Sequence, residues 1–194
     1  MYKFFALLDR MKWINRWGLM KNSYAENLKE HSFQVAVLSH ALCILSNEYF
    51  GTSLSPEKAA EIALFHDISE IITGDMPTPV KYANEELKTN YKNIEAAATE
   101  KIVALLPEEI RKYYYPVTDG ENTPEWRYVK AADTLSAYIK CVNEVSVGNK
   151  DFESAKKNTE AKLRKAAESL PALALFLKDY LPAYEMPIDG LSLN

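Results

Sequence analysis

Two of the three histidines in this sequence, together with two aspartates, stand where a metal site could form. His31 opens an apolar helical pattern, and His66 and Asp67 are adjacent inside another. Asp133 lies among small and apolar residues of a third. A carboxylate among buried apolar neighbours is costly unless a cation compensates its charge. Imidazole nitrogen and carboxylate oxygen suit a divalent transition-metal ion such as Mn, Co, Fe, Ni or Zn, and the lack of thiolates argues against a structural zinc site.

A further acid follows the His66-Asp67 pair at helical spacing. Glu70 is four residues after His66 and three after Asp67, so one continuous helix would place it on the same face, about one turn along. From there it could reach a water or a substrate beside the metal without being a ligand, which is the position of a general acid or base. Asp75 begins the loop just past this helix.

The histidines also have an ordinary structural interpretation. A single histidine on an apolar face is more often a hydrogen-bonded core residue than a ligand, and this holds for His31 or His66 taken alone. His40 is interpreted as such a core residue, because it is nine residues from His31 and therefore on the opposite side of the same helix.

The acids have similar alternatives. Asp133 could form an ion pair with Lys130 or Arg127 one turn earlier. Glu70 and Asp75 could be solvated charges at a helix end. From spacing alone, the metal site and these structural interpretations both stay open.

Helical periodicity dominates the elements that must position these residues. It predicts a single all-α domain over residues 1–194. The expected helices cover residues 4–11, 31–50, 55–74, 84–106, 123–148, 152–169 and 172–181, with loops at 15–29, 75–79 and 113–122 and an irregular tail at 182–194.

The helix expected at 31–50 carries two apolar sets. One set recurs along Val35, Leu38 and Leu42, and a second set, which includes Phe33, Val37 and Ile44, lies around the cylinder from it. A helix that is apolar on much of its circumference is expected in the interior.

Composition restricts the class of partner. The 194 residues are 47% apolar and 26% charged, with a formal net charge of −4 and a pI near 5.5. Polyanion binding usually needs lysine and arginine gathered on one face, and no basic block is present, so a nucleic-acid polymer is not expected as a partner. A small phosphorylated molecule is compatible, because a metal and a few basic groups can neutralise it locally.

Cysteine usage and hydropathy indicate the compartment. Cys43 and Cys141 both lie in apolar helical patterns and are expected as small buried hydrophobes in a reducing cytoplasm. The apolar run at the start of the chain is too short for a signal peptide, and no window approaches the roughly 20 apolar residues of a membrane span. A cytoplasmic protein without membrane contact is therefore expected.

The four candidate ligands in order, on helices, resemble the H…HD…D pattern of the HD-domain phosphohydrolases. The match is closer to one branch, the bacterial 5′-deoxynucleotidases of the YfbR type. One departure is Gly18, where that family is expected to have proline after its Arg-Trp pair. The stretches that carry the resemblance are Ile14-Asn-Arg-Trp-Gly-Leu-Met20, Glu26-Asn-Leu-Lys-Glu-His-Ser32, His66-Asp-Ile-Ser-Glu-Ile-Ile-Thr-Gly-Asp-Met-Pro-Thr-Pro-Val-Lys-Tyr82, Lys130-Ala-Ala-Asp133 and Ala137-Tyr-Ile-Lys-Cys141.

The resemblance implies an HD-domain helical bundle that hydrolyses 2′-deoxyribonucleoside 5′-monophosphates, works as a homodimer and uses one divalent transition-metal ion, such as Co or Mn. Glu70 resembles the catalytic acid or base, and Arg16 resembles a catalytic group that orients the phosphate. By the same comparison the metal ligands are His31, His66, Asp67 and Asp133.

The resemblance also implies substrate contacts. Trp17 resembles the residue set against the sugar, where its bulk would disfavour a 2′-hydroxyl. Without the resemblance, Arg16 and Trp17 could equally be a surface pair in a polar loop. The remaining implied contacts are Arg16, His31, Asp67, Asp75, Met76, Pro77, Thr78 and Asp133, and Lys81 would add positive charge.

Two other functions are compatible with the same residues. The site could act on a nucleoside triphosphate, a cyclic dinucleotide or a guanosine polyphosphate. Alternatively, the chain could be a non-catalytic helical module that binds a metal or a nucleotide. Glu70 discriminates against the second, because a binding module has no need of an acid at that position.

Overall fold

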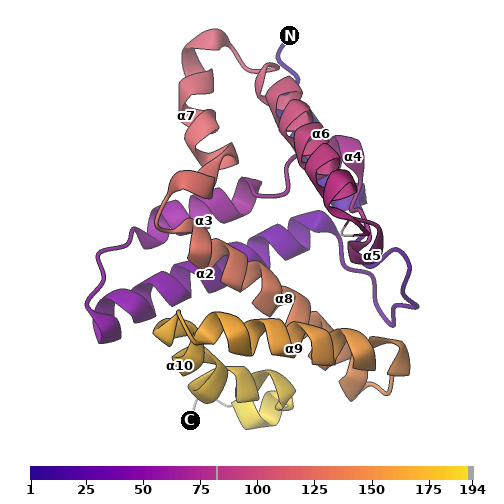
Figure 1. Ribbon diagram of the computed structural model, residues 1–194, viewed down its shortest axis with the longest axis vertical. Helices are drawn as coiled ribbons and strands as arrows, with labels where there is room; N and C mark the ends of the chain where they lie inside the picture. The colour runs from indigo at the N-terminus through magenta and orange to yellow at the C-terminus, as the bar shows by residue number, and fades with distance from the viewer. Residues whose placement is uncertain (82, 192–194) are drawn as a thin grey trace.

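The protein is a bundle of helices in the computed structural model, which describes residues 1–81 and 83–191 (Figure 1). The only extended pairing among these residues is an isolated antiparallel bridge between Asn15 and Asn27, so the predicted all-α class is confirmed. Tyr82 and the last three residues of the expected tail lie outside the described residues. The α-helices are α1 (Phe4–Leu8), α2 (Leu28–Phe50), α3 (Pro56–Phe65), α4 (Glu70–Thr73), α5 (Thr78–Lys81), α6 (Glu85–Val103), α7 (Glu108–Thr118), α8 (Trp126–Ser146), α9 (Glu153–Ala167) and α10 (Pro171–Asp179), and the 3-10 helices are η1 (Asp9–Trp13), η2 (Gly120–Asn122), η3 (Lys150–Phe152), η4 (Leu181–Glu185) and η5 (Ile188–Leu191).

Two clusters of buried apolar side chains hold the bundle together. The larger cluster joins α2, α3 and α8 and is covered by α9 and α10, as their positions in Figure 1 show. The smaller cluster contains Phe4, Ile68, Ile102, Val103 and Leu106, and so connects α1 and α6 to the turn after α3. Along the chain, the His66-Asp67 pair lies between Ala63 of the larger cluster and Ile68 of the smaller one.

Helix α2 begins three residues earlier than predicted. The Asn27 side chain accepts hydrogen bonds from the backbone N–H groups of Lys29 and Glu30, and the Glu30 carboxylate accepts one from the Asn27 N–H. This capping box satisfies the free donors of the first turn and starts the helix at Leu28. His31 is therefore the fourth residue of the helix rather than its first.

The prediction of one continuous helix over residues 55–74 is wrong. Ser55 caps α3 by accepting from the Lys58 N–H, as expected, but α3 ends at Phe65. Tight turns follow, in which the Ile68 N–H donates to the Phe65 carbonyl and the Glu70 N–H donates to the Asp67 carbonyl. The chain thus changes direction at the His-Asp pair, and α4 starts afresh at Glu70.

Three further boundaries differ from the prediction. The stretch expected to be loose at 113–122 is largely α7, which contains Pro116 in its interior. Helix α7 is stabilised from outside, because the Tyr114 ring packs against Phe4 at a centroid distance of 4.9 Å. The stiff loop at 75–79 ends in the short helix α5, and the described part of the tail forms 3-10 turns.

The second apolar set of α2 is not in the interior. Phe33, Val37 and Ile44 are 66%, 53% and 45% exposed, whereas Val35 and Leu42 on the first set are fully buried. The helix therefore buries only one of its two apolar faces within this chain.

Two other sequence-based expectations concern the cysteines and the hydropathy of the helices. Cys43 and Cys141 are free thiols and fully buried, as predicted. Among the described residues, no helix combines the length and the apolar character that a crossing of the bilayer requires.

Candidate metal centre and active site

Four side chains from three elements converge where α2, the end of α3 and α8 meet. His31 Nε2 lies 3.3 Å from Asp133 Oδ1 and 3.6 Å from Asp67 Oδ2. His66 Nε2 lies 3.0 Å from Asp67 Oδ2. One donor atom each from His31, His66 and Asp133 lie within 4.8 Å of one another, which is close enough for a single ion to contact all three. His40 is half-buried on α2 and lies outside this group.

Hydrogen bonds on the far side of each imidazole determine which nitrogen carries the proton. Ser136 Oγ donates to Gln34 Oε1 over 2.6 Å, and so accepts from His31 Nδ1 over 3.0 Å. His66 Nδ1 donates to the Ala63 carbonyl over 2.7 Å. In its neutral form each ring therefore presents an unprotonated Nε2 to the centre of the group.

Each of these two Nε2 atoms is buried and has no hydrogen-bond partner among the described residues. Buried polar atoms normally have a partner, so two orphaned acceptors beside two carboxylates need an explanation. A divalent cation satisfies all of them, because it takes a lone pair from each imidazole and charge from each carboxylate. The residues present thus fit a transition-metal ion.

The protonation of the group is compatible with a cation. Burial lowers the pKa of His31, and the nearby Arg16 adds to this effect, so this imidazole stays neutral. Burial acts against charge on Asp67, but His66 beside it outweighs this effect and holds the pKa of Asp67 well below its usual range. The same pairing raises the pKa of His66 despite its burial. Both shifts arise because Asp67 attracts positive charge at His66 Nε2, and a bound metal ion would supply that charge in place of a proton.

Asp133 has a second partner at the edge of the site. Its Oδ2 accepts a 2.6 Å hydrogen bond from Lys130 Nζ, while its Oδ1 faces His31. Burial would raise the pKa of Asp133, but the positive charge of the nearby Lys130, with the two histidines adding to it, holds that pKa well below its usual value. The helical ion pair considered from the sequence is therefore present together with the inward-facing oxygen.

Glu70 is a buried acid next to this group. It is 6% exposed, and its Oε2 has no hydrogen-bond partner among the described residues. Burial, with the Asp67 and Asp75 carboxylates adding to it, raises the pKa of Glu70 to about 9. The carboxyl group is thus protonated at neutral pH, which is the form a general acid needs. Tight turns, rather than the continuous helix predicted, place it there.

Arg16 reaches the group from the loop that precedes α2. Its side chain is 12% exposed, and Nη1 lies 3.7 Å from Asp67 Oδ2. Burial would lower the pKa of Arg16, but Asp67 and the other nearby carboxylates outweigh it and raise that pKa. Arg16 is therefore a buried cation facing the site and not part of a surface pair.

Trp17 is held in a strained backbone conformation beside Arg16. Its φ of 61° lies in the left-handed region, which is rare for a bulky side chain. Its N–H donates to Asp75 Oδ2 over 3.3 Å, and its ring packs on Phe152 at a centroid distance of 5.2 Å. The hydrogen bond to Asp75 connects the loop before α2 to the loop after α4.

The remaining predicted contacts lie along that second loop. Met76 and Pro77 are partly buried after Gly74, and Thr78 is exposed at the start of α5. Lys81 Nζ lies 2.8 Å from Glu95 Oε1 and 5.0 Å from the centroid of the Tyr91 ring, so it faces α6.

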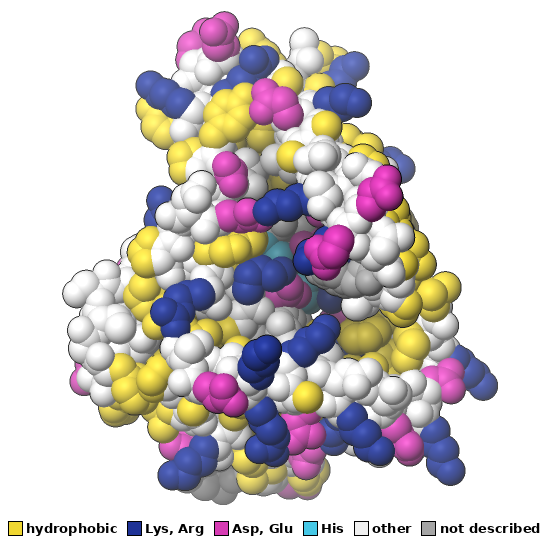
Figure 2. Space-filling model, in the orientation of Figure 1, with side chains coloured by type: hydrophobic (Ala, Val, Ile, Leu, Met, Phe, Trp, Pro, Cys, Tyr) yellow, Lys and Arg dark blue, Asp and Glu magenta, His cyan; other side chains and the backbone are white. Residues whose placement is uncertain are grey.

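The site opens to the surface of the molecule. Figure 2 shows histidine side chains on the floor of a hollow near the middle of the face drawn there, with lysine and arginine side chains around it.

Sequence reasoning assigned no role to two residues that contact the predicted site. Ser136 bonds to His31, and its position three residues after Asp133, on the same face of α8, was the available signal. Glu26 Oε2 accepts from Trp17 Nε1 over 2.8 Å and from Arg16 Nε over 3.3 Å, and Glu26 begins one of the stretches that resemble the family.

Comparison with solved structures defines the class of fold. An HD-domain phosphohydrolase from Listeria innocua superposes with a TM-score of 0.82 at 23% identity, covering 94% of this chain and 88% of the other. A cyanophage S-2L HD phosphohydrolase, solved with dA and one catalytic Zn²⁺ ion, gives a TM-score of 0.60 at 24% identity and covers 88% and 91%. The fold is that of the HD-domain phosphohydrolases.

Sequence comparison identifies the family within that class. Residues 3–184 match the family described as 5′-deoxynucleotidase YfbR-like. A 5′-deoxynucleotidase from Vibrio cholerae is 44% identical over 191 residues, 97% of each chain, and one from Erwinia tasmaniensis is 44% identical over 97% of this chain and 96% of its own. The chain belongs to the YfbR-like 5′-deoxynucleotidase family, which confirms the resemblance seen in its motifs.

Proposed function

We propose that this protein hydrolyses 2′-deoxyribonucleoside 5′-monophosphates to the deoxynucleoside and inorganic phosphate, with the help of one divalent transition-metal ion. The observation that carries the proposal is the pair of buried Nε2 atoms of His31 and His66, which have no hydrogen-bond partner among the described residues and lie beside two ionised aspartates, with Arg16 and the protonated Glu70 next to them. The 5′-deoxynucleotidase relatives match over nearly the whole chain, and the cyanophage structure holds a deoxynucleoside and a zinc ion on this fold.

In this proposal His31, His66, Asp67 and Asp133 hold the ion, with cobalt or manganese as candidates. A bound ion would supply Lewis-acid chemistry, because it lowers the pKa of a water and draws charge from the phosphoryl oxygens. Ser136 and the Ala63 carbonyl keep the two imidazoles in the tautomer that this requires. The oxygens of Asp67 and Asp133, with His31, also border the phosphate.

Arg16 and Glu70 act on the substrate directly. Arg16 binds phosphoryl oxygens through its planar fork and stabilises the negative charge that builds on them. Glu70 donates its proton to the 5′-oxygen as a water adds to phosphorus and the bond between phosphorus and the 5′-oxygen breaks, so that the deoxynucleoside leaves as a neutral alcohol and the water oxygen stays in inorganic phosphate. Its raised pKa supports the role of acid in this step.

The two linked loops recognise the nucleoside. Trp17 lies against the sugar, where its indole excludes a 2′-hydroxyl, and Asp75, Met76, Pro77 and Thr78 line the side of the base and sugar. A Cβ added at Gly18 would meet nothing within 4 Å, so a larger residue than this glycine could be accommodated there. Sugar preference therefore depends on how Trp17 itself is held.

A phosphate-release screen tests the function. Purified protein is stripped with a chelator and then assayed on matched deoxy- and ribonucleoside monophosphates with Co²⁺, Mn²⁺, Zn²⁺ or Mg²⁺. We expect no phosphate release without metal, and release from the deoxy substrates when cobalt or manganese is restored. Inactivity on every deoxynucleotide with every ion would contradict the proposal, and release only from triphosphates would move the activity to another substrate class.

We also propose that two copies of the chain associate through the exposed apolar set on α2. Phe33, Val37 and Ile44 form one row along a helix, and large apolar patches at a surface usually mark an interface. A second copy is the proposed occupant because a two-fold axis lets the same row pair with itself. Residues 1–194 are proposed to act as one domain, and the buried free thiols support a cytoplasmic location.

A further inference from the structure

Glu26 is a buried acid that bonds to both residues proposed to read the phosphate and the sugar. It lies in the loop between η1 and α2 and is 9% exposed. One of its carboxylate oxygens, Oε2, lies 2.8 Å from Trp17 Nε1 and 3.3 Å from Arg16 Nε. A buried carboxylate is costly unless it is paired and hydrogen-bonded, and here its partners are these two side chains.

The backbone of Glu26 is tied to the same segment. The Arg16 N–H donates to the Glu26 carbonyl over 2.9 Å, and the Leu28 N–H donates to the Ile14 carbonyl over 2.9 Å. These two bonds close the base of the loop. Arg16 and Glu26 are therefore linked through both main chain and side chain, and their relative position is well determined.

The contact with Trp17 fixes the rotation of the indole. The left-handed backbone at Trp17 determines where the side chain starts, and the packing on Phe152 supports one face of the ring. The hydrogen bond from Nε1 to Glu26 is the polar contact that fixes the rotation of the indole about the bond that joins it to Cβ. The indole edge that faces a sugar thus depends on Glu26.

The contact with Arg16 orients the guanidinium group. Nε is directed to Glu26, and Nη1 then lies 3.7 Å from Asp67 Oδ2, toward the candidate metal ligands. A planar guanidinium that is held at Nε presents its other nitrogens in a fixed direction. Glu26 therefore determines the direction in which Arg16 meets a phosphate.

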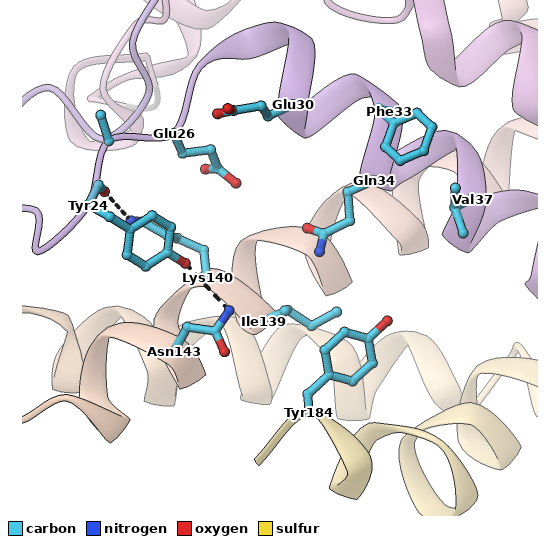
Figure 3. A pocket seen from close by; sticks show the side chains of 11 residues that line it. Tyr24, Glu26, Glu30, Phe33, Gln34, Val37, Ile139, Lys140, Asn143 and Tyr184 are labelled. Carbon is cyan, nitrogen blue, oxygen red and sulfur yellow. Dashed lines mark hydrogen bonds between the residues drawn. The ribbon is translucent and has the colours of Figure 1, made fainter. Parts of the chain in front are cut away.

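Helix α8 anchors the loop that carries Glu26 through contacts with Tyr24. Lys140 on this helix is 2% exposed, donates to the Tyr24 carbonyl over 2.7 Å and lies 3.4 Å from the centroid of the Tyr24 ring. Tyr24 and Lys140 line a pocket of about 450 Å³ together with Glu26 (Figure 3). The loop that carries Glu26 is thus anchored to a core helix.

We propose that Glu26 is a positioning residue for substrate recognition, which holds Trp17 at the angle that excludes a ribose 2′-hydroxyl and directs Arg16 toward the phosphate. The inference rests on the proposed deoxynucleotidase function. It adds a determinant of sugar selectivity that does not itself touch the substrate.

The test compares Glu26→Leu and Glu26→Gln with wild type and with Glu30→Gln. Glu30 lines the same pocket but caps α2, and glutamine retains that capping role. The readout is the ratio of kcat/KM for dAMP to that for AMP. We expect Glu26→Leu to lower this ratio by about tenfold or more, the order expected when a hydrogen bond to a charged group is lost, Glu26→Gln to lower it less, and Glu30→Gln to keep it.

A second readout follows the indole without any substrate. In protein labelled with ¹⁵N-tryptophan, the Nε1–H signal of Trp17 is assigned with Trp17→Phe. We expect Glu26→Leu to shift this signal and to leave those of Trp13 and Trp126 in place, which also reports whether the variant is folded.

The outcomes separate this inference from the proposed function. A wild-type enzyme without deoxy preference contradicts the proposed function, and the Trp17 signal alone then decides whether Glu26 positions the indole. A selective wild type with an unchanged ratio in both Glu26 variants overturns the proposal. An unmoved Trp17 signal in Glu26→Leu overturns it as well, whatever the substrate.

Discussion

At the scale of single residues, the candidate metal centre depends on which nitrogen of each imidazole is protonated. His31 and His66 use Nδ1 for hydrogen bonds within the protein, and this leaves both Nε2 atoms as acceptors. The partner of His66 is a backbone carbonyl that mutation cannot remove. The partner of His31 is the side chain of Ser136, so its contribution can be measured.

Replacing Ser136 with alanine is expected to weaken metal binding about 10- to 100-fold, because outer hydrogen bonds orient a ligand and set its tautomer. The measurement is competition for Co²⁺ or Mn²⁺ against a chromophoric chelator. Ser39→Ala is the matched control, since Ser39 is equally buried but bonds to the Ala36 carbonyl on α2. Equal affinities for Ser136→Ala and wild type would show that His31 needs no such support.

Glu70 is the residue whose removal should separate catalysis from binding. We expect Glu70→Gln to lower kcat by roughly 10²- to 10⁴-fold, because the amide retains the shape of the side chain but cannot transfer the proton. Metal content, measured by atomic spectroscopy, should stay at the wild-type level. Glu85→Gln is the control, on an exposed acid in the first turn of α6. Full turnover by Glu70→Gln would disprove the acid role.

At the scale of elements, the loop before α2 is attached to α8 by a buried ion pair. Glu144 is fully buried, lies next to Lys140 Nζ and accepts from the Ser23 N–H and from Asn149 Nδ2. Burial acts against its charge, but these hydrogen bonds lower the pKa of Glu144 from 4.5 to about 2. The carboxylate therefore contributes more to the folded state than to the unfolded one.

This shift predicts acid-dependent stability. Because the folded pKa of Glu144 is below the unfolded value, its contribution is fully present above about pH 4.5 and is lost as the pH falls toward 2. The free energy of unfolding of wild type should exceed that of Glu144→Gln by about 3–5 kcal/mol at pH 7, since the variant leaves Lys140 buried without its partner.

Urea unfolding of both proteins between pH 7 and pH 3 measures this difference. The difference in the free energy of unfolding between wild type and Glu144→Gln should become smaller below pH 4.5. The contributions of the other acids are common to both proteins and cancel. Glu153→Gln, at an exposed position, serves as the control for a lost charge. A difference in the free energy of unfolding that does not change with pH would rule out Glu144 as the source of the acid-dependent stability.

At the scale of the whole molecule, the two apolar clusters determine where the site lies, and the exposed apolar set of α2 is the surface proposed to meet a second copy of the chain. The larger cluster buries α2 on one side only. Phe33, Val37 and Ile44 remain exposed on the other. A protein that exposes this row alone in water gains free energy by covering it, at roughly 25 cal/mol per Å² of apolar area buried.

Wild type is therefore expected to sediment at twice the chain mass of 22.0 kDa at micromolar concentration. Val37→Asp should shift it toward the single-chain mass, because a charge would be buried at the centre of the row. Ile94→Asp is the control, at a 54% exposed position on α6. A single-chain mass for wild type, or a dimer that tolerates Val37→Asp, would refute this interface.

The sequence by itself determined the all-α class and singled out the four candidate ligands. Local periodicity and caps depend on neighbours within one or two turns, so the helical class and the Ser55 cap could be predicted, whereas spacing alone left the metal site open and the family resemblance favoured it. The resemblance to a family added the role of Arg16 and Trp17, because those positions have no local pattern that distinguishes them from a surface pair.

Only the tertiary structure decided how those residues meet. The chain turns at His66 because the contacts of Ile68 with the second cluster outweigh the helical pattern of residues 55–74. Pro116 stays inside α7 because packing stabilises that helix from outside. The support of the site by Ser136 and Glu26 spans 105 and 10 residues of sequence respectively, and such hydrogen bonds depend on distances in space that no local pattern encodes.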